Sequence, residues 1–156
     1  MTGRPLREKP KETVRVAVSQ DVRTSILPLL KNELVDFASF SELVETIMFL
    51  SEHIYTIEPD NSFVIKLEKI RHKRVLAQIK DHELMRSRFI HVTLDVQAVG
   101  FLDLLVRKYP MLFRNRSDVM ELLLANVGSE CAATKGVRYY ANRLAEVKGM
   151  HPTRKG

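Results

Sequence analysis

Histidines are the side chains of this 156-residue chain with the widest capacity for metal or acid–base chemistry, and there are five of them. Their spacing does not match that of metal ligands. His82 and Glu83 begin the pattern of a zinc-protease helix, but the second histidine of that pattern is absent from the sequence. The six glycines form no phosphate-binding loop. We therefore predict that the protein is not an enzyme, and we expect no catalytic residues, no metal site and no cofactor.

Cys131 is the single cysteine, so no internal disulfide can form. Its neighbours Ala132 and Ala133 indicate helix packing rather than a reactive thiol. No segment near the start has the apolar core of a signal peptide, and no apolar run is long enough to cross a bilayer. These features predict a cytoplasmic protein with no membrane partner.

Positive charge exceeds negative charge, with a formal net charge of +6 and a pI near 9.6. An anionic partner, most often nucleic acid, is therefore favoured. The apolar and charged fractions, 45% and 28%, are those of an ordinary soluble globular protein. Basic residues are concentrated in residues 66–74 and from Lys135 onward. Each of these tracts is either a contact surface for phosphates or a solvated surface.

Two short segments alternate apolar and polar residues, as half-buried strands do. In residues 13–19 the valines at 14, 16 and 18 alternate with polar or small residues, and residues 89–94 follow the same pattern. The outward positions are Thr13, Arg15, Ala17, Phe89, His91 and Thr93. Arginine can donate two hydrogen bonds to guanine, so Arg15 is the strongest candidate for contact with a DNA base. The alternative is that these residues are the ordinary solvated face of a strand.

The two strands begin two copies of a longer repeat. A shift of 76 positions places residues 13–51 over residues 89–127 without a gap. Their apolar positions coincide, and so do Phe37 with Phe113, Ser41 with Ser117 and Glu45 with Glu121. Each copy therefore predicts a strand followed by two helices. We interpret the paired phenylalanines as core residues rather than as base-stacking residues.

Capping residues mark where the helices of each copy begin. Ser19 and Asp95 are placed to cap the first helices, and Asn115 is placed to cap the second helix of the second copy. Ser39 with Glu42 forms a capping box before a helix that is expected to run to about residue 53.

Prolines affect the first helix of each copy differently. Pro28 falls inside the predicted helix, where it should kink the chain or delay the start of the helix. Pro110 should end the corresponding helix of the second copy after Tyr109. Between the copies we expect a turn at residues 59–61, an extra strand at residues 63–67 and a basic helix at about residues 68–86. A last helix is expected at residues 137–147.

One copy cannot fold alone, because a single strand leaves its backbone groups unpaired and its helices have too little to pack against. Two copies can, if the strands pair antiparallel over the helices. The predicted fold class is α+β and mainly helical. The predicted parts are a basic arm at 1–12, a first unit at 13–53, a linker with a turn and a basic helix at 54–87, a second unit at 88–134 and a basic C-terminal helix and tail at 135–156. A two-stranded ribbon fits the DNA major groove.

Each copy resembles a ribbon-helix-helix unit, the class of MetJ and Arc. The likeness lies in the alternating strand, the polar residue after it, and residues 37–44 (FASFSELV) and 113–120 (FRNRSDVM). The second stretch is similar to a common form of the family, in which a cap residue, arginine and serine precede an acidic residue and an apolar pair. The tandem arrangement resembles TraY-like accessory proteins of conjugative-plasmid relaxosomes.

The resemblance implies that the outward strand residues contact base edges. It also implies that the start of each second helix holds a DNA phosphate, with residues Ser39, Phe40, Ser41, Asn115, Arg116 and Ser117. The serines and the asparagine are alternatively helix caps alone, although capping and phosphate binding use the same free N–H groups and are compatible.

Two classes of function follow. The first is sequence-specific binding of double-stranded DNA, as a transcriptional regulator or as a relaxosome or partition accessory protein. Its partners would be DNA, a relaxase or another protein, and further copies of the chain on DNA. The second is a protein-interaction module on the same fold, as the family's antitoxins are.

Overall fold

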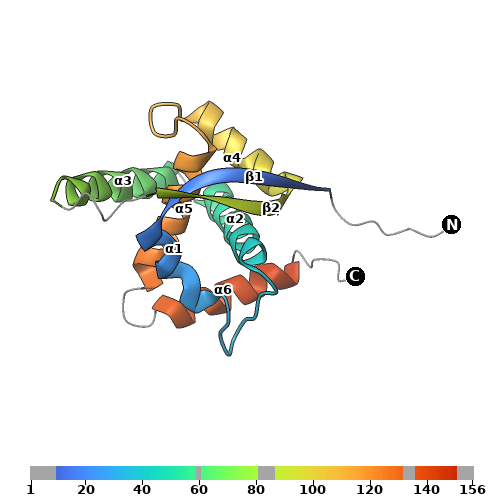
Figure 1. Ribbon diagram of the computed structural model, residues 1–156. Helices are drawn as coiled ribbons and strands as arrows, with labels where there is room; N and C mark the ends of the chain where they lie inside the picture. Colours follow the sequence, from blue (N-terminus) through green and yellow to red (C-terminus); the bar gives the residue numbers. More distant parts are fainter. Residues whose placement is uncertain (1–9, 59–60, 81–86, 132–135, 151–156) are drawn as a thin grey trace.

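A computed structural model describes residues 10–58, 61–80, 87–131 and 136–150 (Figure 1). Most of the predicted arm, part of the turn at 59–61, His82 with Glu83, and the last six residues lie outside the described residues. The elements are β1 Lys11–Ser19, α1 Gln20–Ile26, the 3₁₀ helix η1 Leu27–Leu29, α2 Phe40–Ile57, α3 Ser62–Lys80, β2 Ser87–Asp95, α4 Val96–Lys108, α5 Arg116–Cys131 and α6 Gly136–Met150. The fold is mainly helical with one two-stranded sheet, so the predicted α+β class is confirmed.

The two predicted strands pair antiparallel within one chain. Arg15 lies opposite His91, with Thr13 opposite Thr93 on one side of this pair. The inward residues are buried, namely Val14, Val16, Val18, Ile90, Val92 and Leu94. This apolar face covers α2 and α5, as Figure 1 shows, and both helices contribute most of their length to the core.

The predicted strand at residues 63–67 is wrong, because α3 begins at Ser62 and includes these residues. Phe63, Val64 and Leu67 are buried, and their spacing is that of one helical face. Ile65, which a strand would have turned to the same side as Phe63 and Leu67, is 47% exposed. The basic helix therefore starts earlier than predicted.

Pro28 does not delay the start of α1, and the α-helix ends two residues before it. The helix begins at Gln20 and ends at Ile26, and Pro28 then occupies an early position of η1. The missing N–H of proline is not needed at that position. At the corresponding place in the second copy, α4 ends at Lys108 with Tyr109 as its cap, as Pro110 predicts.

The predicted caps are present with one exception. Ser39 accepts a hydrogen bond from the Glu42 N–H, and Asp95 accepts one from the N–H of Gln97. Ser19 stands at the cap position of α1 without a side-chain cap, because its hydroxyl donates to Glu121 instead. The helix α2 extends beyond its predicted end, to Ile57, and α5 ends at Cys131. The last helix, α6, spans slightly more than residues 137–147.

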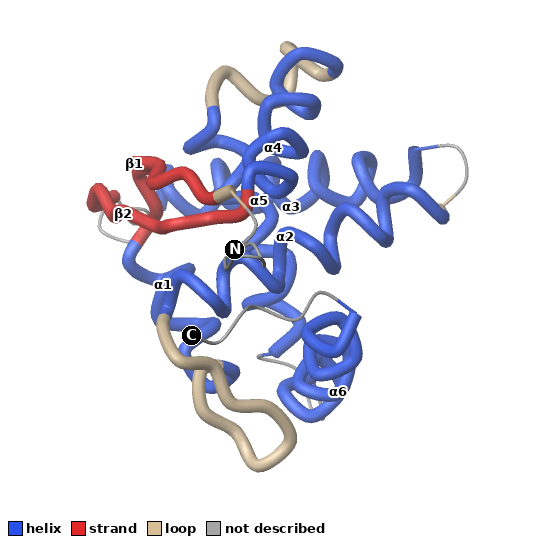
Figure 2. Tube along the Cα trace, turned by 90° about the vertical axis from the view of Figure 1, so that its right-hand side faces the viewer, coloured by secondary structure: helices blue, strands red, loops and turns tan. Residues whose placement is uncertain are grey.

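The third helices, α3 and α6, occupy corresponding places. Shifted by 77 positions, Phe63, Val64 and Leu67 of α3 fall on Tyr140, Ala141 and Leu144 of α6, and all six are buried. Both helices pack against α2 and α5. The second half of α3 extends away from the other helices (Figure 1), and Figure 2 shows the start of α3 beside the end of α2. Among the described residues, no helix is long and apolar enough to span a membrane.

Candidate nucleic-acid interface

All six residues predicted to contact bases lie on the outer face of the ribbon. Thr13, Arg15, His91 and Thr93 are exposed, Ala17 is half-buried, and the Phe89 side chain is 58% exposed. Register places Arg15 and His91 in the centre of this face and Ala17 opposite Phe89. The face is therefore continuous, open, and different at its two ends.

Arg15 lies flat against Phe89, with its guanidinium carbon 3.5 Å from the ring centroid. The two residues are diagonal neighbours across the ribbon, the distance at which long and aromatic side chains meet. A cation over an aromatic face is attracted by the ring. No carboxylate pairs with Arg15 in the described part of the chain. An exposed phenylalanine here holds an arginine whose N–H groups are free to donate.

Thr13 and Thr93 close one end of the face, with their hydroxyl oxygens 2.9 Å apart. A single hydrogen bond between two hydroxyls uses only one of their two protons, so the other remains available for an outside acceptor. The opposite end, with Ala17 and Phe89, offers an apolar surface, which suits contact with a thymine methyl group.

The starts of α2 and α5 are tied to the two edges of the ribbon. Ser41 accepts a hydrogen bond from the N–H of Thr93 at 3.0 Å, and Ser117 accepts one from the N–H of Ala17 at 2.8 Å. These bonds satisfy edge N–H groups that would otherwise be open. They also place a helix N-terminus beside each end of the outer face.

Two glutamates repeat this arrangement one turn further along each helix. Glu45 accepts from the N–H of Asp95 at 2.5 Å, and Glu121 accepts from the N–H of Ser19 at 2.7 Å. Each carboxylate also has a cation. Lys11 pairs with Glu45 at 2.9 Å, and Arg74 pairs with Glu121 at 2.8 Å.

Arg74 belongs to the interior rather than to a solvated basic surface. Its side chain is 14% exposed and bridges Glu121 and Asp21, the latter at 3.0 Å. Burial opposes its charge, but hydrogen bonds and the charges of both carboxylates outweigh this and raise its guanidinium pKa above the ordinary value. Lys66, from the same tract, pairs with Glu130 at 3.3 Å. Sequence reasoning missed this role of the tract.

The six residues predicted to hold phosphates lie at the two helix starts. Ser39 and Asn115 cap the N–H groups of Glu42 and Asp118 at 3.1 and 3.0 Å. Phe40 is half-buried, with Arg23 over its ring at 5.5 Å. The first N–H groups of a helix have no acceptor within the helix, so each start keeps a positive end directed outward.

Arg116 is held by carboxylates. It donates to both oxygens of Asp103, at 2.8 and 2.9 Å, and to Glu12 at 3.3 Å. The hydrogen bond from Arg116 lowers the pKa of Asp103 despite partial burial. A phosphate at this helix start must therefore compete with Asp103 and Glu12 for the guanidinium.

Arg114 is a cation at the same helix start that sequence reasoning missed. Its side chain is 80% exposed and pairs with Asp118 at 3.1 Å. The sequence signal was its place just before the cap residue Asn115, where a long cationic side chain can reach beyond the helix end.

The described residues contain neither a cluster of metal ligands nor a reactive thiol. In the described ranges, no group of three histidine, cysteine or acidic side chains could hold a metal ion. Burial, with the charge of Glu130, raises the pKa of the Cys131 thiol to about 11. A thiol that stays protonated at neutral pH is a poor nucleophile.

The chain matches no family model, no curated protein and no solved structure. Its function therefore has to be inferred from the geometry of the ribbon and the helices beside it.

Proposed function

We propose that the protein binds double-stranded DNA sequence-specifically, with the outer face of the ribbon in the major groove. The observation that carries this proposal is Arg15, an exposed arginine without a carboxylate partner among the described residues, set on Phe89 in the centre of a ribbon narrow enough for the groove. Helix starts at both ends of the face suit contact with the flanking phosphates.

We further propose that the chain is a tandem pair of ribbon-helix-helix units. The repeat shift of 76 relates Arg15 to His91 (15 + 76 = 91), and these residues lie directly opposite each other, as an approximate two-fold axis requires. The same shift converts the bond from Thr93 to Ser41 into the bond from Ala17 to Ser117.

Glu45 and Glu121 are related by the same shift of 76 positions. Their hydrogen bonds support the proposed tandem pair of units independently of the pairing of the strands. The shift also relates Ser19 to Asp95. The same shift converts the bond from the Ser19 N–H to Glu121 into the bond from the Asp95 N–H to Glu45. Each second helix is thus bonded to the strand of the other unit. The pairing supports one intrachain DNA-binding face.

On this proposal Arg15 donates two hydrogen bonds to a guanine, and the threonine hydroxyls and His91 contact neighbouring base edges. Corresponding strand residues differ, since Thr13, Arg15 and Ala17 match Phe89, His91 and Thr93. The preferred DNA site should therefore be asymmetric. The cellular role would be that of a cytoplasmic transcriptional regulator or of a relaxosome or partition accessory protein, with a relaxase or further copies on DNA as additional partners.

The test is selection of a preferred duplex from random DNA, followed by fluorescence anisotropy titrations of variants. Arg15→Ala should lose about 1–3 kcal/mol of preference for that duplex, roughly 5- to 150-fold, with little change in thermal stability because Arg15 faces outward. Arg138→Ala, an exposed arginine on α6, is the matched control and should keep the preference. Equal binding by the Arg15 variant and wild type would rule out the ribbon as the reading surface.

A protein-interaction module is the second candidate, and α3 is the observation that favours it. Its projecting half exposes Val75, Leu76 and Ile79 at 42%, 49% and 67%. Exposed apolar side chains grouped on a protruding helix are typical of a protein-binding surface. If the wild-type protein shows no preference for any selected duplex even at low salt, this candidate replaces the first.

A further inference from the structure

The helix α3 has a second apolar face, which points away from the core. Ile65, Val75, Leu76 and Ile79 are exposed to 47%, 42%, 49% and 67%, and we call these four residues the outer stripe. Ile65 lies about three turns before Leu76 (76 − 65 = 11), so both are on one side of the helix. The exposed His72 lies between them on the same side.

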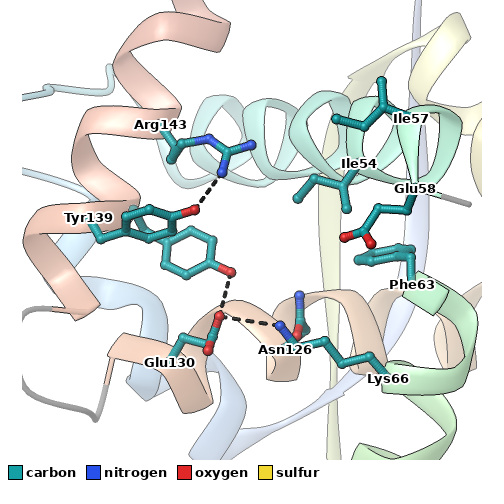
Figure 3. A pocket seen from close by; sticks show the side chains of 10 residues that line it. Ile54, Ile57, Glu58, Phe63, Lys66, Asn126, Glu130, Tyr139 and Arg143 are labelled. Carbon is teal, nitrogen blue, oxygen red and sulfur yellow. Dashed lines mark hydrogen bonds and ion pairs between the residues drawn. The ribbon is translucent and has the colours of Figure 1, made fainter.

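The opposite face of α3 holds the helix in the fold. Leu67 is buried, and it lies two and a half turns before Leu76 (76 − 67 = 9), which places the two side chains on opposite sides. Phe63 and Lys66 line a pocket of about 380 Å³ together with residues of α2, α5 and α6 (Figure 3). Core packing therefore does not require the outer stripe. A group of exposed apolar side chains on a protruding helix is typical of an interaction surface.

Positive charge dominates the same helix, since α3 contains six lysines and arginines and a single acidic residue, Glu68. Lys66 pairs with Glu130, and Arg74 pairs with Glu121 and Asp21. The cations that pair with no carboxylate among the described residues are Lys69, Arg71, Lys73 and Lys80. Without Lys80, which Asp81 follows in the sequence, three such cations remain against Glu68.

These cations border the outer stripe on both sides. Lys69 and Lys73 are one turn apart, and Lys73 lies three positions before Leu76 (76 − 73 = 3). Arg71 lies one turn before Val75 (75 − 71 = 4), on the other side of the stripe. Glu68 is toward the start of α3, so the second half of the helix carries only positive charge. A helix lying along the stripe would pass between cations.

Two other occupants fit this surface less well. Two copies of α3 packed stripe against stripe would bring cations against cations in either direction, because both borders of the stripe are basic. A DNA backbone would match the cations but would leave the exposed apolar side chains without a contact. The combination of an apolar stripe with basic borders is complementary to an amphipathic helix that has acidic borders.

We propose that the outer stripe of α3 binds an acidic amphipathic helix of a partner protein. Apolar side chains of the partner helix pack on Leu76 and Ile79, and its carboxylates pair with Lys69, Lys73 and Arg71. This inference rests on the protein-binding surface put forward above for α3, and it names the chemistry of the partner. It does not depend on DNA binding.

Fluorescence anisotropy of labelled peptides with the full chain, without DNA, tests this. The probe is a synthetic helical peptide about three heptads long, with leucine at positions a and d and glutamate at e and g. Its twin has lysine in place of glutamate. At low salt the glutamate peptide should bind roughly 10- to 100-fold more tightly, and this advantage should decrease as salt is added. Absence of saturable binding of the glutamate peptide would overturn the proposal.

Equal binding of the two peptides, if lost in α3 variants, would overturn the acidic partner but leave α3 as a protein-binding surface. Neither result bears on the DNA-binding proposal, which the Arg15 variant tests separately.

Variants locate the contact. Leu76→Gln and Ile79→Gln should each weaken binding of the glutamate peptide roughly 5- to 50-fold. Met111→Gln is the control, because Met111 is 92% exposed but lies outside α3. Lys73→Glu should reduce the preference for the glutamate peptide, whereas Arg138→Glu on α6 should keep it. Equal effects of the α3 variants and their controls would contradict the site.

Further measurements on the Leu76→Gln variant distinguish the other occupants. Its thermal unfolding should match that of wild type, because Leu76 is exposed. Sedimentation of wild type that shows a dimer, lost in this variant, would mean that the stripe binds a second copy. Equal losses of affinity for random-sequence DNA in Leu76→Gln and Lys73→Glu would mean that α3 binds DNA. Either result would overturn the proposal.

Discussion

Arg74 lies in a stretch of charged residues that is typical of a solvated helix surface, but its side chain is largely buried and forms ion pairs. It lies in a basic tract of α3, yet it joins Asp21 of α1 to Glu121 of α5. Glu121 in turn holds the backbone of Ser19 at the end of β1. The arginine therefore connects α3 to the edge of the ribbon. Removing one member of a buried ionic group leaves the others without compensation.

Arg74→Met should lower the free energy of unfolding by about 2–4 kcal/mol, because two carboxylates lose their shared cation while the methionine keeps much of the packing. Lys73→Met, an exposed neighbour on α3, should change it by less than about 0.5 kcal/mol. Urea denaturation of both variants is the measurement. Equal stability of the two would show that the bridge contributes nothing beyond a surface pair.

At the scale of elements, the starts of α2 and α5 share geometry but differ in charge. Both begin at a capping residue and are bonded to a ribbon edge through Ser41 or Ser117. The first has the uncharged Phe40 where the second has Arg116, which is held by Asp103 of α4. The two proposed phosphate contacts should therefore differ in strength. The contact at the start of α5 should be the stronger one because of Arg116, and Asp103 and Glu12 should weaken it by competing for that arginine.

Asp103→Asn should strengthen DNA binding and steepen its salt dependence by up to about one unit, because it releases Arg116 for a phosphate. Asp103 is 44% exposed, so the loss of folding stability should stay below about 1 kcal/mol. Arg116→Ala alone should lower the slope by less than about one unit, because Asp103 and Glu12 already hold part of its charge, and should weaken binding to all sequences alike.

Anisotropy titrations at several salt concentrations provide the readout, and the double variant is the control. In the Arg116→Ala background, Asp103→Asn should have a smaller effect on the slope. If Asp103→Asn acts equally in both backgrounds, the aspartate repels DNA directly and Arg116 makes no phosphate contact.

At the scale of the whole molecule, the repeat relates residues at both ends of α2 and α5. It pairs Arg15 with His91 on the ribbon and, with a shift of 77, Lys66 of α3 with Arg143 of α6, which line one pocket at the far ends of α2 and α5. Both pairs depart from exact symmetry, since the paired side chains differ. A single chain with two unlike halves can prefer an asymmetric DNA site, which an exactly symmetric dimer cannot.

Giving both strands the same outward residues should therefore change the preferred DNA site. A triple variant with Phe89→Thr, His91→Arg and Thr93→Ala gives both strands the outward residues of β1, so the selected DNA site should become palindromic. Sequencing of duplexes selected by wild type and by the variant would show this. An unchanged asymmetric site would mean that readout does not come from the ribbon.

Local patterns in the sequence determined the strands, most helix starts and the burial of Phe37 and Phe113. Alternation and capping depend on residues within a few positions of each other, so the chain carries these signals by itself. The gapless repeat also indicated that two like segments could pair, and it predicted the mainly helical α+β class.

Tertiary structure alone decided that residues 63–67 are helical, and it alone decided which residues the charged groups pair with. Within these five residues both a strand period and a helical period fit, and packing against α2 and α5 selected the helix. Arg74 finds Asp21 and Glu121 at separations of 53 and 47 positions, and Arg116 finds Glu12 at 104. Contacts across such distances depend on how the elements pack in three dimensions. Local periodicity carries no information about that packing.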